Sequence, residues 1–184
     1  MPVHTRDKCE AGNPCRERQC TVDVRANYVR FKGLSFKYAN VCMVIHGNRI
    51  WDNDDPRWVY SDGHHVTVED CEFSSTWYAG LVLTFGAQRN LIKGNYGALN
   101  GEQGSLLMNN GGESVHDNLF LGNRCDPADP VGRRAGGYHR CISNYGVVGQ
   151  RNHVIGNIMK SRHCYRTKYT VSDTVIQGNV MVGS

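Results

Sequence analysis

Residues 88–95 read QRNLIKGN, and residues 150–157 read QRNHVIGN. Both stretches contain a short apolar segment that ends in Gly-Asn. Four other segments repeat the pattern of a short strand, a Gly or Asp and a second short strand; they begin at Val29, Val66, Val115 and Val175. Self-similarity at an interval of roughly 20 to 50 residues is the sequence signature of a solenoid or another repeat architecture. The repeated unit therefore decides the fold before any single motif is considered.

The residue that follows the Gly or Asp of each repeat forms a column that is mostly asparagine. The aligned residues are Leu34, Cys71, Asn95, Asn118, Asn157 and Asn179. Three of the intervals are 22 to 24 residues, and the other two are longer by about 15, the size of an inserted loop. Asn tolerates the left-handed backbone conformation at a tight bend, and stacked amides can hydrogen-bond along an axis. We therefore predict an asparagine ladder along the solenoid.

The composition indicates a soluble all-β chain. The 184 residues include 21 Gly and 16 Asn, which favour turns, together with many Val, Ile, Tyr and Phe, which favour strands. With 40% hydrophobic and 21% charged residues, the chain is neither a disordered tail nor a coiled coil. The longest apolar run, residues 41–45, is far shorter than the about 20 residues that span a bilayer, so we expect no membrane contact. Residues 1–8 do not read as a secretory signal, so either a signal has been removed or the frame begins inside a longer protein.

On these repeats the chain resembles the right-handed parallel β-helix family, the pectate-lyase-like superfamily of carbohydrate-active proteins, over about residues 21–182. The expected fold class is all-β, a right-handed parallel β-helix of about six coils with two loop insertions. Residues 1–20 form an irregular Cys-rich cap segment in this interpretation, and residues 21–184 form the β-helix. An uncapped solenoid exposes strand edges, so we expect missing sequence, another domain or a second copy stacked end to end to cover the C-terminal end.

Two polar insertions interrupt the repeats, at roughly residues 47–63 and 122–139, and by the alignment they leave the coil at different corners. Long loops on a rigid scaffold often contain functional residues. The first insertion includes Asp52, Asp54 and Asp55, which either bind Ca²⁺ or form a solvated acidic loop. The glycine and the distal Glu of the helix-loop calcium motif are missing.

The eight cysteines are more than a cytosolic protein commonly has, which favours an extracellular or periplasmic location. We expect four of them to be buried, unreactive thiols: Cys42, Cys71, Cys141 and Cys164. The others, Cys9, Cys15, Cys20 and Cys125, are expected in a disulfide-stapled cap. Zinc is disfavoured because no C-x2-C pair occurs.

Candidate site residues occur near the second insertion and in a late strand. Arg166 and Lys168 share one side of a strand, where they suit a uronate polymer or simply maintain solubility. Tyr138 and His139, together with Arg140, close the second insertion and could assist proton abstraction next to a carboxylate or anchor the loop. The adjacent pair His64 and His65 comes just before the strand expected at residues 66–68, and by strand alternation only one of the two side chains can face a given groove.

The resemblance implies that a polymer lies along one parallel sheet, that an Arg or Lys acts as base, and that calcium neutralises the uronate carboxylate. It gives the catalytic candidates Lys168, Arg166, His139 and Tyr138, the substrate-binding candidates Arg133, Arg134, Trp58 and His65, and the metal ligands Asp52, Asp54 and Asp55. The Gly-His-Gly and Asn-Thr-Asp motifs of the related hydrolases are absent, which excludes polygalacturonase-type hydrolysis. Residues 126–129 read DPAD and lack the histidine of the alginate epimerase signature.

Two functional hypotheses follow. The first is a carbohydrate-binding or carbohydrate-processing protein, most consistent with a lyase that acts on an acidic polysaccharide. The second is a non-catalytic β-helix that assembles by end-to-end stacking or belongs to a larger extracellular protein. Nucleic acid is not an expected partner, because the net charge of +4 is spread along the chain and the three Trp residues are not interleaved with a basic stripe.

Overall fold

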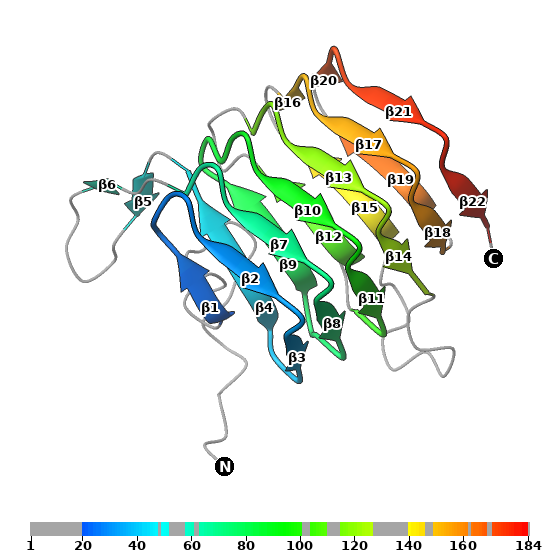
Figure 1. The fold of residues 1–184 in the computed structure, drawn as a ribbon, viewed down its shortest axis with the longest axis horizontal. Helices are drawn as coiled ribbons and strands as arrows, with labels where there is room; N and C mark the ends of the chain where they lie inside the picture. Colours follow the sequence, from blue (N-terminus) through cyan, green and yellow to red (C-terminus); the bar gives the residue numbers. More distant parts are fainter. Residues whose placement is uncertain are drawn as a thin grey trace.

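A computed structural model describes residues 20–47, 49–51, 58–60, 63–100, 104–109, 115–126, 140–145, 149–161, 163–168 and 171–183. The regular secondary structure of these residues consists of β-strands. Three parallel six-stranded sheets wind into a single β-helix of six coils (Figure 1). The predicted all-β solenoid is confirmed. The described residues include no helix that is long and apolar enough to span a membrane. The predicted cap segment lies outside the described residues except for Cys20.

Each coil contributes one strand to each sheet, in the same direction as its neighbours. Sheet A is formed by β1 (Cys20–Val24), β4 (Val41–His46), β9 (Ala79–Thr84), β12 (Gly104–Asn109), β15 (Arg140–Tyr145) and β19 (His163–Lys168). Sheet B is formed by β2 (Arg30–Lys32), β7 (Thr67–Glu69), β10 (Leu91–Lys93), β13 (Leu119–Leu121), β17 (His153–Ile155) and β21 (Val175–Gln177). Sheet C is formed by β3 (Ser35–Lys37), β8 (Glu72–Ser74), β11 (Tyr96–Ala98), β14 (Arg124–Cys125), β18 (Ile158–Lys160) and β22 (Val180–Val182).

The two insertions leave the coil at different corners, as predicted. The first lies between β4 and β7, at the corner from sheet A to sheet B, and contains an antiparallel hairpin of β5 (Arg49–Trp51) and β6 (Trp58–Tyr60). The second lies between β14 and β15, at the corner from sheet C to sheet A. Residues 122–125 still belong to the regular coil, so this insertion begins later than expected. A short parallel pair, β16 (Gly149–Gln150) and β20 (Val171–Ser172), extends the last two coils.

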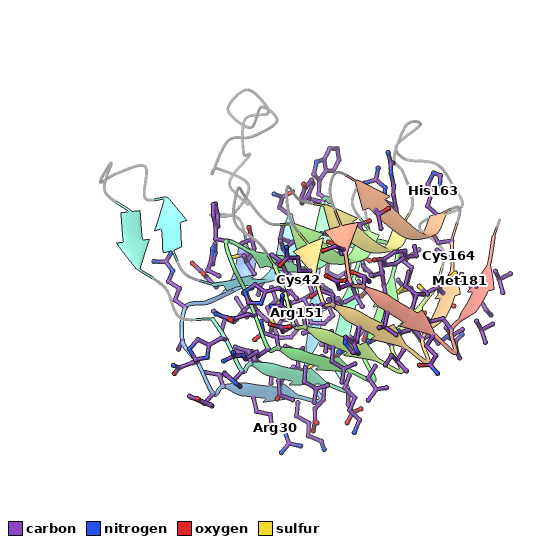
Figure 2. All side chains as sticks on the ribbon, turned by 90° about the horizontal axis from the view of Figure 1, so that it is seen from above. Arg30, Cys42, Arg151, His163, Cys164 and Met181 are labelled. Atoms are coloured by element: carbon purple, nitrogen blue, oxygen red, sulfur yellow. A yellow bond between two sulfur atoms is a disulfide. The ribbon has the colours of Figure 1, made fainter. Side chains whose placement is uncertain are left out.

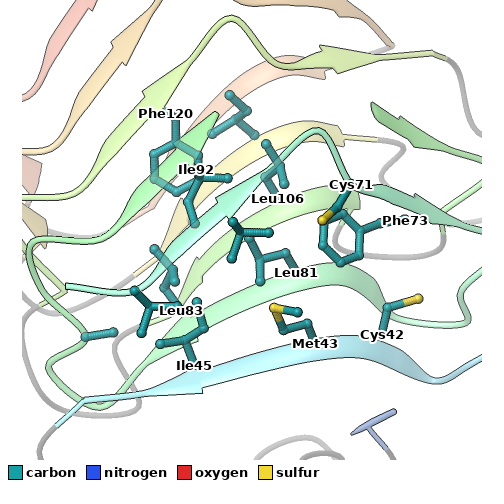
Figure 3. Close-up of a cluster of buried hydrophobic side chains, with 14 of the residues drawn as sticks. Cys42, Met43, Ile45, Cys71, Phe73, Leu81, Leu83, Ile92, Leu106 and Phe120 are labelled. Atoms are coloured by element: carbon teal, nitrogen blue, oxygen red, sulfur yellow. The ribbon is translucent and has the colours of Figure 1, made fainter. Parts of the chain in front are cut away.

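The core fills the interior of the coils with stacked apolar side chains (Figure 3). On sheet B the central residue of each strand points inward, and Val68, Ile92, Phe120 and Val154 are fully buried. Sheet C contributes Phe73 and Met159 in the same way. Because each such side chain leaves water completely, its burial stabilises the fold by about 1.5 to 3 kcal/mol. Apolar columns thus hold successive coils together.

The asparagines form two main ladders, one on each side of sheet B. After sheet B, the amide of Asn95 donates to Oδ1 of Asn123 at 3.0 Å, and Asn123 donates to Asn157. Before sheet B, Asn90 donates to Asn118 at 3.0 Å, and Asn118 donates to Oδ1 of Asn152 at 3.1 Å. The predicted ladder is therefore confirmed in kind, but placing Asn118 in the same column as Asn95 was wrong. The correct member of that column is Asn123.

The cysteines correct one further expectation. Cys125 and Cys141 form a disulfide that links β14 to β15 across the second insertion, with 5.6 Å between their Cα atoms. Cys141 is therefore not a thiol, and Cys125 is not tied to the N-terminal segment. Cys42 and Cys71 are buried thiols, as predicted, and Cys164 is a half-buried one. Cys9 and Cys15 lie outside the described residues.

Candidate functional site on the outer face of sheet A

The outer face of sheet A is polar and basic where β15 and β19 run side by side. Their register pairs Arg140 with His163 and Ser143 with Arg166. The intervening residues Ile142 and Tyr165 pack in the core, so alternation along the strands places Ser143 and Arg166 on the outer side. Arg140 and Ser143 are buried, whereas His163 and Arg166 are half-buried. We call Arg140, Ser143, His163 and Arg166 the basic face.

Towards the N-terminus the same outer face becomes apolar. Val41, Val44, Ala79 and Val82 form a second hydrophobic cluster that is separate from the interior core. Each of them is at most 4% exposed, although these side chains lie on the outer side of β4 and β9. The outer face of sheet A is therefore covered over this region.

An acid and a histidine mark the N-terminal end of this face. Nε2 of His46 lies 3.2 Å from Oδ1 of Asp23, and Arg25 contacts the other carboxylate oxygen at 2.6 Å. Burial alone would raise the pKa of Asp23, but the hydrogen bonds with His46 and Arg25 outweigh it, so the pKa lies below its ordinary value. Asp23 is on β1 and Arg166 on β19, at opposite ends of the sheet, so the acid does not neutralise the basic face.

One predicted catalytic residue, Arg166, belongs to this face, and a second, Lys168, follows it on the same strand. Arg166 and Lys168 both lie on β19, and the backbone of Lys168 pairs with Tyr145. Tyr138 and His139 directly precede β15 in the sequence but lie outside the described residues, as do Arg133, Arg134, Asp52, Asp54 and Asp55. His163 and Cys164 of β19 lie at the same end of the solenoid as Met181, and Arg30 projects from the opposite face (Figure 2).

His65 and Trp58 are not near the basic face. Trp58 is in the hairpin strand β6. His65 is in the second coil, at the corner from sheet A to sheet B, so four strand spacings, roughly 19 Å, separate it from the coil of Arg166. It is a turn residue with a φ of 54° and lies just before β7, so the strand alternation expected for the pair His64 and His65 does not apply to it. Its ring stacks on Tyr28 at 5.0 Å, and its Nδ1 lies 2.7 Å from Nδ1 of His64.

Ser143 and His163 were not predicted from the sequence, whereas Arg140 was predicted only as a partner of Tyr138 and His139. The signal was available, because Cys141-Ile142 aligns with Cys164-Tyr165, an alignment that sets His163 beside Arg140 and Arg166 beside Ser143. Among the described residues no group of three or more His, Cys, Asp or Glu side chains could hold a metal ion. The expected calcium ligands lie outside this part of the chain.

Fold and site define a parallel β-helix with one basic outer face. A family model described as "Right handed beta helix region" matches residues 15–159, and the chain belongs to this family. No curated protein and no solved structure is similar enough to count as a match. Membership supports a carbohydrate-related or a structural role for the chain.

Proposed function

We propose that the chain binds an acidic polysaccharide along the outer face of sheet A and cleaves it as a lyase. The observation that supports this most is the pairing of β15 with β19, about 4.8 Å apart, which sets the half-buried His163 and Arg166 beside the buried Arg140 and Ser143. Cations at this spacing suit a polymer that has a carboxylate on each sugar. Lys168 extends the same strand by two residues.

The chemistry needs a cation at the uronate carboxylate and a base beside it. The base removes the proton on the carbon next to the carboxylate, the electron pair forms a carbon–carbon double bond, and the glycosidic oxygen leaves and is protonated. We assign these two roles to Arg166 and Lys168: one binds the uronate carboxylate, and the other removes the proton. Tyr138 and His139 are proposed to assist from the end of the second insertion, with Arg133 and Arg134 binding further along the polymer.

The test is the ultraviolet absorbance of unsaturated uronate, with polygalacturonate, polymannuronate and polyguluronate as substrates. Arg166→Ala and Lys168→Ala should each lower the rate by about 100-fold or more. Arg30→Ala is the matched control, because Arg30 is an exposed Arg on sheet B that pairs with Glu69. Absence of unsaturated product from every polymer would overturn lyase activity, and full activity of Arg166→Ala would overturn the assignment to this face.

Location and cofactor belong to the same proposal. A buried disulfide between Cys125 and Cys141 is favoured in an oxidising compartment, so we place the protein outside the cell or in the periplasm. Calcium is proposed only through Asp52, Asp54 and Asp55 in the first insertion. Loss of activity in a chelator, restored by Ca²⁺, would support this proposal, and unchanged activity would contradict it.

Assembly by end-to-end stacking is the second candidate, and the last coil favours it. Ile176 and Met181 are 44% and 46% exposed, although the residues below them in the same inward columns, Val154 and Met159, are fully buried. In a head-to-tail contact the last coil of one copy would meet the first coil of the next copy. The backbone N–H of Asn179 would then face Leu34, which occupies the ladder position but has no amide oxygen to accept the bond. We therefore expect the association to be weak. Sedimentation velocity of the wild type and of Met181→Lys tests it: association lost in the variant supports stacking, and a concentration-independent monomer contradicts it.

A further inference from the structure

The outer face of sheet C has a hydrogen-bonded cluster that the proposed lyase site does not use. Tyr96 on β11 pairs in register with Arg124 on β14, and its hydroxyl donates to Oδ2 of Asp126 at 2.8 Å. Nη2 of Arg124 donates to the same oxygen at 3.1 Å, and the guanidinium lies 5.8 Å from the centre of the Tyr96 ring. Three side chains from adjacent coils thus fix one another in place.

A second carboxylate lies on the other side of Tyr96. Glu72 on β8 pairs with Tyr96 in register and accepts hydrogen bonds from Lys37 at 2.9 Å, Ser35 at 2.9 Å and Ser74 at 3.0 Å. The bond from Lys37 keeps the pKa of Glu72 below its ordinary value, so the group is ionised at neutral pH. Glu72 and Asp126 are two coils apart, which corresponds to roughly 10 Å.

The side chains between the two carboxylates are small, and aromatic rings are exposed near them. Ser74 and Ala98 occupy adjacent positions in register. Tyr96 is 36% exposed, and at the next corner of the coil Tyr38 and Trp77 are 84% and 51% exposed. Exposed rings beside fixed polar groups are typical of a binding surface rather than of a merely solvated face.

The charges on this face select the kind of ligand. Lys37 pairs with Glu72 and Arg124 pairs with Asp126, so the cluster has little net charge to attract a polyanion. A carboxylate has about four lone-pair sites. Glu72 uses three of them, for Lys37, Ser35 and Ser74, and can still accept a bond from a hydroxyl group, whereas Asp126 is fully used by Tyr96 and Arg124. An aromatic ring offers a flat apolar surface for the C–H face of a sugar.

We propose that Glu72, Tyr96, Arg124 and Asp126 form a binding site for a neutral, hydroxyl-rich glycan chain. This site is separate from the basic face of sheet A and takes a different class of sugar. Tyr96 contacts the sugar ring, Glu72 accepts one of its hydroxyls, and Asp126 holds Tyr96 and Arg124 in position. The proposal stands independently of lyase activity, because it involves none of the residues on β15 or β19.

The experiment is isothermal titration with linear hexasaccharides of β-1,4-linked glucose, xylose and mannose at millimolar concentration, and with hexagalacturonate as the acidic counterpart. At least one neutral hexasaccharide should bind the wild type, and Tyr96→Ala and Asp126→Asn should each weaken it by about tenfold. Tyr28→Ala is the matched control, because Tyr28 is 73% exposed at a different corner of the coil. The affinity of this variant for the hexasaccharide should stay within about twofold of the wild type. Binding of hexagalacturonate should be the same in Tyr96→Ala as in the wild type.

Three outcomes would overturn the proposal. The first is that no neutral hexasaccharide binds the wild type. The second is that Tyr96→Ala binds as well as the wild type, or that Tyr28→Ala is equally weakened. The third is that Tyr96→Ala changes the sedimentation coefficient by dissociating a dimer, because the face is then a contact between copies of the chain. Tyr96→Phe guards against misfolding, since it keeps the ring and should retain part of the affinity.

Discussion

Asn123 donates both its backbone N–H and its side-chain amide to Oδ1 of Asn157, at 2.8 and 3.0 Å. The same amide also donates to the carbonyl of Ile92 at 2.8 Å, and Asn95 donates to Asn123 in turn. Every polar atom of this side chain is therefore bonded while the residue is only 1% exposed. A ladder of this kind satisfies backbone groups at a corner where water has no access.

Replacing Asn123 with Ala should destabilise the solenoid strongly. The change removes the partner of the backbone N–H of Asn95 and of the carbonyl of Ile92 in a buried corner, while Oδ1 of Asn157 keeps the backbone N–H of residue 123. Each unsatisfied buried group costs about 1 to 3 kcal/mol, so we expect a loss of at least about 2 kcal/mol in the free energy of unfolding. Urea denaturation followed by circular dichroism measures it.

The control for the ladder is Gln177→Ala, which truncates an exposed amide side chain at the end of β21. Its free energy of unfolding should stay within about 0.5 kcal/mol of the wild type. Equal stability of Asn123→Ala and Gln177→Ala would mean that the ladder contributes nothing beyond turn formation.

The fold could be predicted because the repeat is local and frequent, but the register of the ladder could not be read as easily. Residues 90–95, 118–123 and 152–157 read NLIKGN, NLFLGN and NHVIGN, so each has an Asn before and after the sheet B strand. An alignment guided by Asn alone can slip by five positions, and it did so at Asn118. The residue before each Asn is in the left-handed region, with a φ of 57° at Asp117 and 62° at Gly122, so the two corners share a backbone conformation. Only the pairing of Asn95 with Asn123 across coils separates the two columns.

The site was less predictable for a physical reason. A candidate such as Arg166 can be predicted from the sequence of its own strand. Its spatial neighbours, however, come from β15, which lies one full coil and about 23 residues earlier in the sequence. Which residues face outward depends on alternation within sheet A, where Cys42 and Met43 both belong to the interior cluster although they are consecutive. Such an interruption of alternation shifts the remainder of the strand and is not visible in composition or spacing.

The disulfide should contribute more than any single buried thiol. Cys125 and Cys141 close a loop with a sequence separation of 16, for which chain entropy predicts about 3 kcal/mol of stabilisation. The double variant Cys125→Ala, Cys141→Ala should lose about this amount in thermal or urea denaturation. Cys42→Ala is the control, since it removes a buried sulfur without removing a cross-link. A non-reduced peptide digest that pairs Cys125 with another cysteine would contradict the assignment.

Cys42 should be inert in the folded protein. Burial raises the pKa of its thiol to about 12, and the sulfur donates to the carbonyl of Phe36 at 3.3 Å. At pH 8 only about one molecule in ten thousand would have the thiolate, which is the reactive form. Iodoacetamide followed by mass spectrometry should therefore label Cys42 only after denaturation. Labelling of Cys42 in the native protein at the rate of a small free thiol would show that the coil opens at this position.

Asp117 should make the protein less stable in acid. Its carboxylate accepts two hydrogen bonds from Arg151, at 2.7 and 2.9 Å, and lies 2.7 Å from Nδ1 of His116. The bonds from Arg151, and then the contact with His116, lower the pKa of Asp117 well below its ordinary value. An unfolded Asp has a pKa of about 4, so the unfolded chain takes up the proton first as the pH falls. The stabilisation is therefore complete above about pH 4 and is lost as the pH falls towards the folded pKa.

The measurement is the urea midpoint of the wild type and of Asp117→Asn between neutral pH and pH 3. The wild type should be the more stable at neutral pH, and the difference should shrink as the pH falls below the unfolded pKa. Asp173→Asn is the control, because Asp173 has a φ of 52°, close to the 57° of Asp117, and Asn tolerates this conformation equally well. A difference between the wild type and Asp117→Asn that stays constant down to pH 3 would show that the carboxylate charge does not act through Arg151.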